Sequence, residues 1–289
     1  MSLSALYDVP APAKLNRFLH VIGRRADGYH LLQSVFVLID WCDRLHFELR
    51  GDGVLARHDL GAALPADDLC LRAARSLQRQ SGTALGADIS LDKRLPWGAG
   101  LGGGSSDAAS TLLALNRLWR LNWSRARLSS LAASLGADVP FFVGGDNAFV
   151  EGIGDKLTPV ALPVQCYAVV KPAAAIATAD IFGSPDLVRD TGAVILAGSF
   201  ASAVLADDFG RNDLQAVAEA RCPEVRKVAK WLHSQFGNSR MTGSGSAVFA
   251  RVGTHERSSA AWPVRAAPGT WIARMCRSLD HHPLRDWAD

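Results

Sequence analysis

The sequence has little of what marks a secreted or membrane-embedded protein. Its five cysteines are scattered, odd in number and never spaced Cys-x-x-Cys, which argues against a disulfide framework or a thiolate metal site. The N-terminus lacks the basic, apolar and small-residue regions of a signal peptide. The uncharged stretch 191–206 is too short and too rich in serine and glycine to cross a bilayer. We therefore expect a cytoplasmic protein with reduced thiols and no membrane attachment.

Basic clusters are also missing. The formal net charge is only +3, and no run of lysine or arginine indicates a nucleic-acid-binding face. With 289 residues, of which 48% are hydrophobic, the chain is long enough for two domains of ordinary size or one large one. This balance suits an enzyme for anionic small molecules. We expect a monomer or a weak homodimer with no nucleic-acid partner.

Glycine, in contrast, is concentrated at one place. Residues 96–109 read PWGAGLGGGSSDAA, with five glycines in seven positions directly before a helical pattern. A loop without Cβ atoms lets backbone N–H groups approach an anion, and the N-terminus of the following helix adds its positive dipole end. The stretch predicts a phosphate-binding loop, with Ser105 as a helix cap. A flexible linker is the alternative, but linkers do not lead directly into a helix.

Three common phosphate-binding loops do not fit. The G-x-G-x-x-G spacing of a dinucleotide fold is present, but residues 108–137 hold no acidic side chain for a ribose. A Walker A loop needs a Gly-Lys pair, and the chain has none. A protein kinase needs a lysine on the next strand and an HRD loop, and both are missing although residues 208–210 read DFG.

The loop does resemble the second motif of the GHMP kinases, the family of galactokinase, homoserine kinase and mevalonate kinase. Two further motifs of that family are present in the right order, APAKLN at 11–16 and MTGSGSAVF at 241–249. The resemblance spans most of the chain. It implies an α+β two-domain GHMP kinase fold, with an N-terminal ribosomal S5 domain 2-like domain (1–160) and a C-terminal ferredoxin-like domain (161–289). The active site would lie in the cleft between them.

Local patterns agree with this fold. Apolar alternation predicts strands at 45–49, 87–91, 166–170 and 247–252, and helical spacing predicts helices at 69–80, 107–118 and 129–135. The last helix is expected to end at Gly136, with Pro140 closing it off. The proline-rich stretch 158–163 marks the domain boundary.

The segment GRRADGYH at 23–30 identifies a subgroup of the family. Together with LGADVPFF at 135–142 and Asn212-Asp213-Leu214, it resembles the members whose acceptor alcohol carries a cytidine diphosphate. That resemblance implies ATP-dependent phosphorylation of a hydroxyl of this acceptor, in isoprenoid precursor synthesis. A GHMP kinase for another alcohol, such as homoserine, and a nucleotide-binding regulatory relative without activity are the alternatives.

Two residues are expected to carry the chemistry. Asp138 occupies the position of the family's catalytic aspartate, which implies a general base or orienting group. Lys14 stands in a short apolar segment, where a lysine needs a partner, and pairing with Asp138 and the acceptor oxygen would provide one. On the residues alone, a surface aspartate and an exposed lysine at a strand end are the alternatives.

The resemblance also assigns binding residues. The ATP-binding set comprises Lys93, Pro96, Gly98, Gly100, Leu101, Gly102, Gly103, Gly104, Ser105 and Ser106. Mg²⁺ would arrive with ATP, because no metal cage is visible in the sequence. The acceptor set comprises Asn16, Tyr29, His30, Phe182, Thr242, Gly243, Ser244 and Gly245. In this set the Tyr29 and Phe182 rings would stack on cytosine while His30 reads its edge; for Phe182, core packing is the alternative, and for 242–245, a plain turn.

Two acidic residues fit this assignment poorly. Asp68 stands where the resembled enzymes often have an asparagine, which puts a nucleotide contact in doubt. Asp107 adds negative charge beside the phosphate loop, where it would repel ATP unless it points away or helps to bind Mg²⁺.

Overall fold

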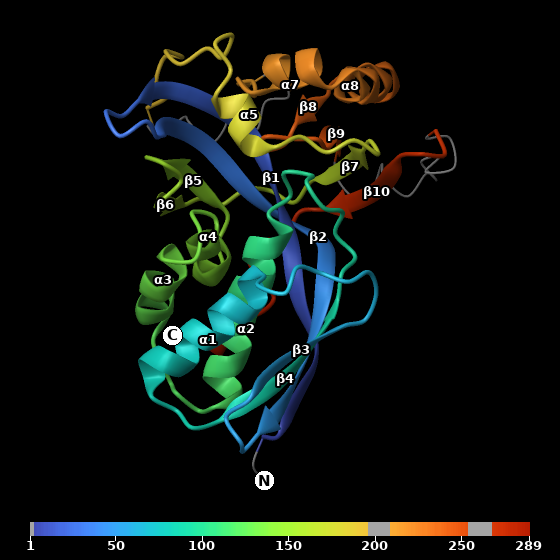
Figure 1. The fold of residues 1–289 in the computed structure, drawn as a ribbon. Helices are drawn as coiled ribbons and strands as arrows, with labels where there is room; N and C mark the ends of the chain where they lie inside the picture. The colour runs from blue at the N-terminus through green and yellow to red at the C-terminus, as the bar shows by residue number, and fades with distance from the viewer. Residues whose placement is uncertain (1–2, 196–208, 254–267) are drawn as a thin grey trace.

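One long β-hairpin runs through the computed structural model, which describes residues 3–195, 209–253 and 268–289 (Figure 1). Its strands are β1 (Ala5–Arg24) and β2 (His30–Arg50), paired antiparallel with four irregularities in register that bend the hairpin. Within the sheet β1 pairs only with β2. As an edge strand, β1 tolerates Pro10 and Pro12, which have no N–H to donate.

The first sheet has six strands and is covered by helices. Its order is β3-β4-β2-β5-β6, with β1 paired to β2 beside this path, and only the β3–β4 pair is parallel. The shorter strands are β3 (Leu55–Asp59), β4 (Gly86–Asp92), β5 (Ala148–Glu151) and β6 (Lys156–Pro159). The helices beside it in Figure 1 are α1 (Leu69–Ser81), α2 (Gly103–Leu118), α3 (Arg125–Ala133) and α4 (Val139–Gly144).

A second, four-stranded antiparallel sheet lies at the other end of the hairpin. Its order is β10-β7-β9-β8, and α7 and α8 lie at this end of the molecule (Figure 1). The strands are β7 (Cys166–Lys171), β8 (Arg240–Met241), β9 (Val248–Gly253) and β10 (Ile272–Arg277). The helices are α5 (Thr178–Phe182), α7 (Gln215–Arg221) and α8 (Pro223–Phe236).

Strand β2 contributes to two cores because its side chains alternate between faces. Phe36 and Leu38 pack in the cluster with α1–α4, whereas Val35, Val37 and Ile39 pack in the cluster with the second sheet. A third cluster joins the second sheet to α7 and α8. The hairpin thereby holds both sheets in one continuous packing arrangement.

The end of the chain returns to the first half. Leu279 N donates to Leu38 O at 2.8 Å, Leu284 is buried in the cluster with α1–α4, and Arg125 N donates to Asp289 O at 2.7 Å. The division of the chain into 1–160 and 161–289 stays a prediction, and these contacts show that the last residues pack against the first part.

The expected helices form with shifted ends. Helix α1 agrees within one residue, but α2 begins at Gly103 instead of Asp107. The expectation that Ser105 caps it is wrong: Gly102, in the left-handed region at φ 74°, stands at the N-cap and makes no side-chain cap bond.

The third helix and the proline after it also differ from expectation. Helix α3 starts earlier because Ser124 caps it, and it ends at Ala133. Pro140 does not close this helix but lies in the first turn of α4, where its missing N–H costs nothing.

The remaining expectations from the sequence concern disulfides, membrane-spanning segments and the DFG sequence. All five cysteines are free thiols. Within the described ranges, no helix is both long enough and apolar enough to cross a membrane. Most of the apolar stretch 191–206, and Asp208 of the DFG sequence, lie outside the described residues.

Gly86 provides a test of this packing. A Cβ built at Gly86 would stand 2.1 Å from Val54 O, which is backbone and has no room to move, whereas a Cβ at Gly51 meets nothing within 4 Å. We expect Gly86→Ala to lower the free energy of unfolding by about 1–3 kcal/mol in urea titrations. Gly51→Ala should change it by less than about 0.5 kcal/mol. Equal effects of the two substitutions would contradict the packing described here.

Candidate active site

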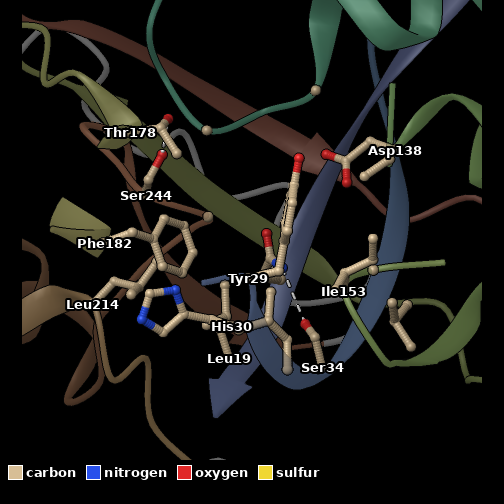
Figure 2. Close-up of a pocket in the computed structure, with 18 of the residues that line it drawn as sticks. Leu19, Tyr29, His30, Ser34, Asp138, Ile153, Thr178, Phe182, Leu214 and Ser244 are labelled. Atoms are coloured by element: carbon tan, nitrogen blue, oxygen red, sulfur yellow. Dashed lines mark hydrogen bonds between the residues drawn. The ribbon is translucent and has the colours of Figure 1, made fainter. Parts of the chain in front are cut away.

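A cavity of about 890 Å³ lies where the two sheets meet (Figure 2). This volume is within the range of small-molecule sites. Its walls come from the long hairpin, the glycine loop, the start of α4, helix α5 and the loop between β8 and β9. A second cavity of about 360 Å³ adjoins the other side of the glycine loop, and Gly98, Gly100 and Gly102 line both cavities. The glycine loop therefore connects the two spaces.

The glycine loop is fixed by backbone contacts to two distant segments. Lys14 N donates to Leu101 O at 2.9 Å, which ties the loop to β1. A Cβ at Gly100 would stand 2.2 Å from Thr242 O, so only glycine allows this approach. The loop is held in a left-handed conformation at Gly98, Gly100 and Gly102. It is a rigid cradle leading into the N-terminus of α2.

The smaller cavity contains most of the predicted ATP residues. Its lining includes Lys93, Pro96, Gly98, Gly100, Leu101, Gly102, Gly103 and Gly104. Ser105 instead lines the larger cavity, and Ser106 is fully buried, its hydroxyl without a partner among the described residues. The cradle, free of Cβ atoms and adjoining the N-terminus of a 16-residue helix, fits a chain of phosphates.

Lys93 is held between two buried carboxylates. Its Nζ donates to Asp43 Oδ2 and, at 2.7 Å, to Asp107 Oδ2. Burial acts to lower the pKa of Lys93, but the two carboxylates outweigh it and leave that pKa raised. Burial and the charge of Asp43 raise the pKa of Asp107 against the pull of Lys93. Asp107 therefore points to Lys93, which offsets the repulsion of phosphate that the sequence suggested.

The lysine and aspartate expected to carry the chemistry lie together. Lys14 Nζ is 3.5 Å from Asp138 Oδ2, donates to Asn16 Oδ1 at 2.6 Å and lies 4.5 Å from the centre of the Phe36 ring. Lys14 is 3% exposed, whereas the Asp138 side chain is 31% exposed. A buried ammonium thus faces a carboxylate that still reaches the cavity, and Figure 2 shows Asp138 pointing into it.

Aromatic side chains form one end of the larger cavity. Tyr29 is exposed at the tip of the hairpin, and His30 lies against Phe182 with ring centres 5.0 Å apart. Figure 2 shows Tyr29 standing between Asp138 and this pair of rings. Phe182 is half-buried and reaches the cavity, so it is not a core residue alone.

The loop between β8 and β9 divides into two parts. Gly243, Ser244 and Gly245 line the larger cavity, but Thr242 does not. Thr242 is fully buried and its hydroxyl accepts from Asn16 N at 2.9 Å. The structure therefore gives Thr242 a place beneath the site, where it joins the loop to β1.

Sequence reasoning missed several residues that shape the site. Asp43 is fully buried and also accepts from the backbone N–H groups of Arg94 and Leu95, at 2.6 and 2.7 Å. Asn212 donates to the carbonyls of Met241 and Gly243, both at 2.8 Å. No sequence signal marks Asp43, because Asp40 and Arg44 are charged residues close to it in the same strand. Asn212 was noticed only as part of a resemblance, without a role.

Asp68 has a structural role. It caps α1 by accepting from Leu71 N at 3.0 Å, and it pairs with Arg57 at 2.8 Å. Both contacts use Oδ1, and Asp68 also lines the smaller cavity, so its part in nucleotide binding stays an open expectation. In the part of the chain that the structure describes, no cluster of three or more histidine, cysteine or acidic side chains could hold a metal ion.

Comparisons with known proteins agree with this geometry. A model of the GHMP kinase N-terminal domain matches residues 68–146, and a model of the GHMP kinase C-terminal domain matches 200–263. The chain is 65% identical to 4-diphosphocytidyl-2-C-methyl-D-erythritol kinase of Methylibium petroleiphilum, over the whole of both chains. It is 55% identical to the enzyme of the same name from Polaromonas naphthalenivorans, covering 99% of this chain and 97% of the relative.

Solved structures give the same result. A crystal structure of 4-(cytidine 5'-diphospho)-2C-methyl-D-erythritol kinase matches with a TM-score of 0.77 and 33% identity, over 92% of this chain and 98% of that one. Homoserine kinase from Cytophaga hutchinsonii shares the fold at a TM-score of 0.68 and 15% identity, over 96% and 95% of the two chains. The chain belongs to the GHMP kinase family, within its 4-diphosphocytidyl-2-C-methyl-D-erythritol kinases.

Proposed function

We propose that this chain phosphorylates the 2-hydroxyl of 4-diphosphocytidyl-2-C-methyl-D-erythritol at the expense of ATP, in the non-mevalonate route to isoprenoid precursors. The named relatives support the reaction, and the site supports it independently. The observation that carries the proposal is the Lys14–Asp138 pair at the glycine loop that joins the two cavities. Because ATP is a cytoplasmic metabolite, we place the reaction in the cytoplasm.

The smaller cavity fits the phosphoryl donor. ATP, when bound, supplies the phosphoryl group; the chain supplies the cradle at 98–104, the N-terminus of α2 and the half-buried cation of Lys93. Mg²⁺ would enter with ATP and keep several waters, since the described residues offer it no cage of their own.

The larger cavity fits the acceptor. Tyr29 and Phe182 offer aromatic faces to cytosine, and base–aromatic stacking is worth ~1–3 kcal/mol per base. Gly243, Ser244 and Gly245 present a short polar loop toward the diphosphate. This leaves the polyol end of the acceptor near Asp138.

The chemical step follows from the Lys14–Asp138 pair. Asp138 accepts the proton of the acceptor hydroxyl while the oxygen of that hydroxyl bonds to the γ-phosphorus of ATP. The bond between this phosphorus and the ADP oxygen breaks, and ADP leaves. Lys14 stabilises the negative charge that develops on that oxygen. Asn16, bonded to Lys14 at 2.6 Å and to Ser34 at 3.0 Å, keeps the ammonium in place. Holding both partners close together and in line lowers the barrier further.

The acceptor requirement is the first prediction. With Mg-ATP, we expect ADP release in the presence of 4-diphosphocytidyl-2-C-methyl-D-erythritol, and none above background with 2-C-methyl-D-erythritol, homoserine or galactose. Without the cytidine diphosphate, the aromatic end of the cavity makes no contact. Turnover of an uncytidylated alcohol would support a kinase activity but contradict the proposed cytidine pocket. ATP binding with no turnover of any acceptor would indicate a regulatory relative.

The catalytic pair gives the second prediction. Asp138→Asn should lower kcat by about 10²–10⁴-fold with little change in the KM for ATP, because a general base is lost while the smaller cavity is intact. Lys14→Met should lower kcat as well, and the double variant should lose much less than the product of the two effects, since the residues act as one unit.

Asp286→Asn is the matched control, because Asp286 is exposed and remote from both cavities. Its steady-state kinetics should equal those of the unaltered enzyme. If the double variant lost kcat by the full product of the two single effects, the pair would not work as proposed.

A further inference from the structure

Arg189 lies behind the aromatic end of the larger cavity and connects two of its residues. Its Nε donates to His30 Nε2 at 3.0 Å, and its Nη2 donates to Phe182 O at 3.1 Å and to Ser184 O at 2.7 Å. A fourth bond runs from Nη1 to Leu187 O at 2.9 Å. Arg189 itself does not line the cavity. Its side chain is thus committed to holding the segment after α5 against the His30 ring.

The contact fixes which nitrogen of His30 carries the proton. A guanidinium has N–H donors and no acceptor, and it stays protonated at every physiological pH. His30 Nε2 must therefore offer its lone pair to Arg189, and in the neutral ring the proton then stands on Nδ1. Among the described residues Nδ1 has no hydrogen-bond partner, and Figure 2 shows the His30 ring beside Phe182 at the cavity wall.

We propose that Arg189 is a specificity-determining residue: by holding His30 as the Nδ1–H tautomer, it makes this wall of the cavity a hydrogen-bond donor and selects cytosine over uracil. This inference rests on the proposed function, because it takes the larger cavity as the cytidine site. Phe182 shares the same anchor, so one side chain sets both the stacking ring and the hydrogen-bonding ring.

The selection follows from the chemistry of the two bases. Ring atom N3 of cytosine is an acceptor, whereas N3 of uracil carries a proton and is a donor. A donor at His30 Nδ1 pairs with N3 of cytosine. Against uracil it leaves two donors facing each other in the cavity, with neither of them paired. The opposite tautomer would accept from uracil. Arg189 excludes that tautomer, which is discrimination by an unfavourable contact with the wrong base.

The charges around His30 act in the same direction. Burial lowers the pKa of His30, and the positive charges of Arg189 and Arg24 lower it further. Arg24 extends from the hairpin and lines the cavity, whereas Arg189 approaches from the segment after α5. An imidazolium, which would place an N–H against the Arg189 N–H, is thereby disfavoured.

Two measurements test the proposal, and the first needs no turnover. In the unaltered protein labelled with ¹⁵N-histidine, NMR at pH 7 should show His30 protonated at Nδ1 and unprotonated at Nε2, with the signals assigned by comparison with His30→Gln. A proton on Nε2 would overturn the proposal, even if Arg189 variants fail to fold. This result does not depend on whether the acceptor is the one proposed.

The second measurement is the base preference. In Arg189→Met, which keeps the chain length and removes the donors, the ratio of kcat/KM for the cytidylyl acceptor over its uridylyl analogue should fall about tenfold, the worth of one hydrogen bond. The KM for ATP should not change. Arg189→Lys should recover part of the preference for the cytidylyl acceptor, because lysine can donate a hydrogen bond but cannot accept one. Arg221 is exposed, and Arg221→Gln should leave the preference unchanged.

The outcomes separate this proposal from the proposed function. If the unaltered enzyme does not turn over the cytidylyl acceptor, the function fails, and calorimetric binding of cytidine diphosphate against uridine diphosphate replaces the kinetic ratio. A folded Arg189→Met protein with an unchanged base preference would overturn the proposal. The proposal would also be overturned if Arg189→Met lowered kcat/KM equally for both acceptors and Arg189→Lys did not recover it. That is the behaviour expected of a purely structural anchor.

Discussion

The close approach of the glycine loop to the loop between β8 and β9 is the constraint on which the site depends. Gly100 lies so close to Thr242 O that a methyl group there would stand 2.2 Å away, and Ser246 N and Ala247 N donate to Gly98 O and Ala99 O at 3.0 and 3.1 Å. Loops are ordinarily the mobile part of a fold. This one is bonded on both sides, so its N–H groups are already oriented before any phosphate arrives, and little ordering free energy remains to be spent on binding.

The same contacts explain why the proposed catalytic pair, Lys14 and Asp138, stands where it does. The bond from Lys14 N to Leu101 O fixes β1 against the loop, and the irregularities in the β1–β2 register between Pro12 and Ala13 and between Asn16 and Leu19 flank this region. Asp138 comes from an unrelated segment at the start of α4. The two cavities share only lining residues of the glycine loop, and the Lys14–Asp138 pair lines the larger one beside that loop, which is where the proposed reaction would transfer the phosphoryl group.

Prediction from the sequence succeeded where a residue's local pattern carries its role. The order of three motifs carried the resemblance that implied the fold, and the comparisons confirm that fold. The residues predicted to bind ATP, from Lys93 to Gly104, line one cavity, and their role stays a prediction. Prediction failed where a role depends on a partner far along the chain. Ser105 looked like a cap, but the tight turn at Gly102 starts the helix earlier. Thr242 was expected to contact the acceptor, but it is buried and its hydroxyl accepts from Asn16 N, 226 residues away, a contact that no local pattern indicates. Arg189 gave no local signal at all, since only folding brings His30 to it.

The lysines on the two sides of the glycine loop differ in how far their charge is balanced by carboxylates. Beside the smaller cavity, Lys93 lies between Asp43 and Asp107, so the lysine is held rigidly and its charge is balanced within the protein. Beside the larger cavity, Lys14 has only the partly exposed Asp138 as a charged partner among the described residues. In the proposed reaction, a cation whose charge is already balanced would attract the phosphates of ATP only weakly, so it contributes little to binding by charge alone. A cation such as Lys14, whose charge is less fully balanced, stabilises a neighbouring oxygen most when that oxygen becomes negative. In the proposed reaction this stabilises the transition state more than the bound substrate, which lowers the barrier.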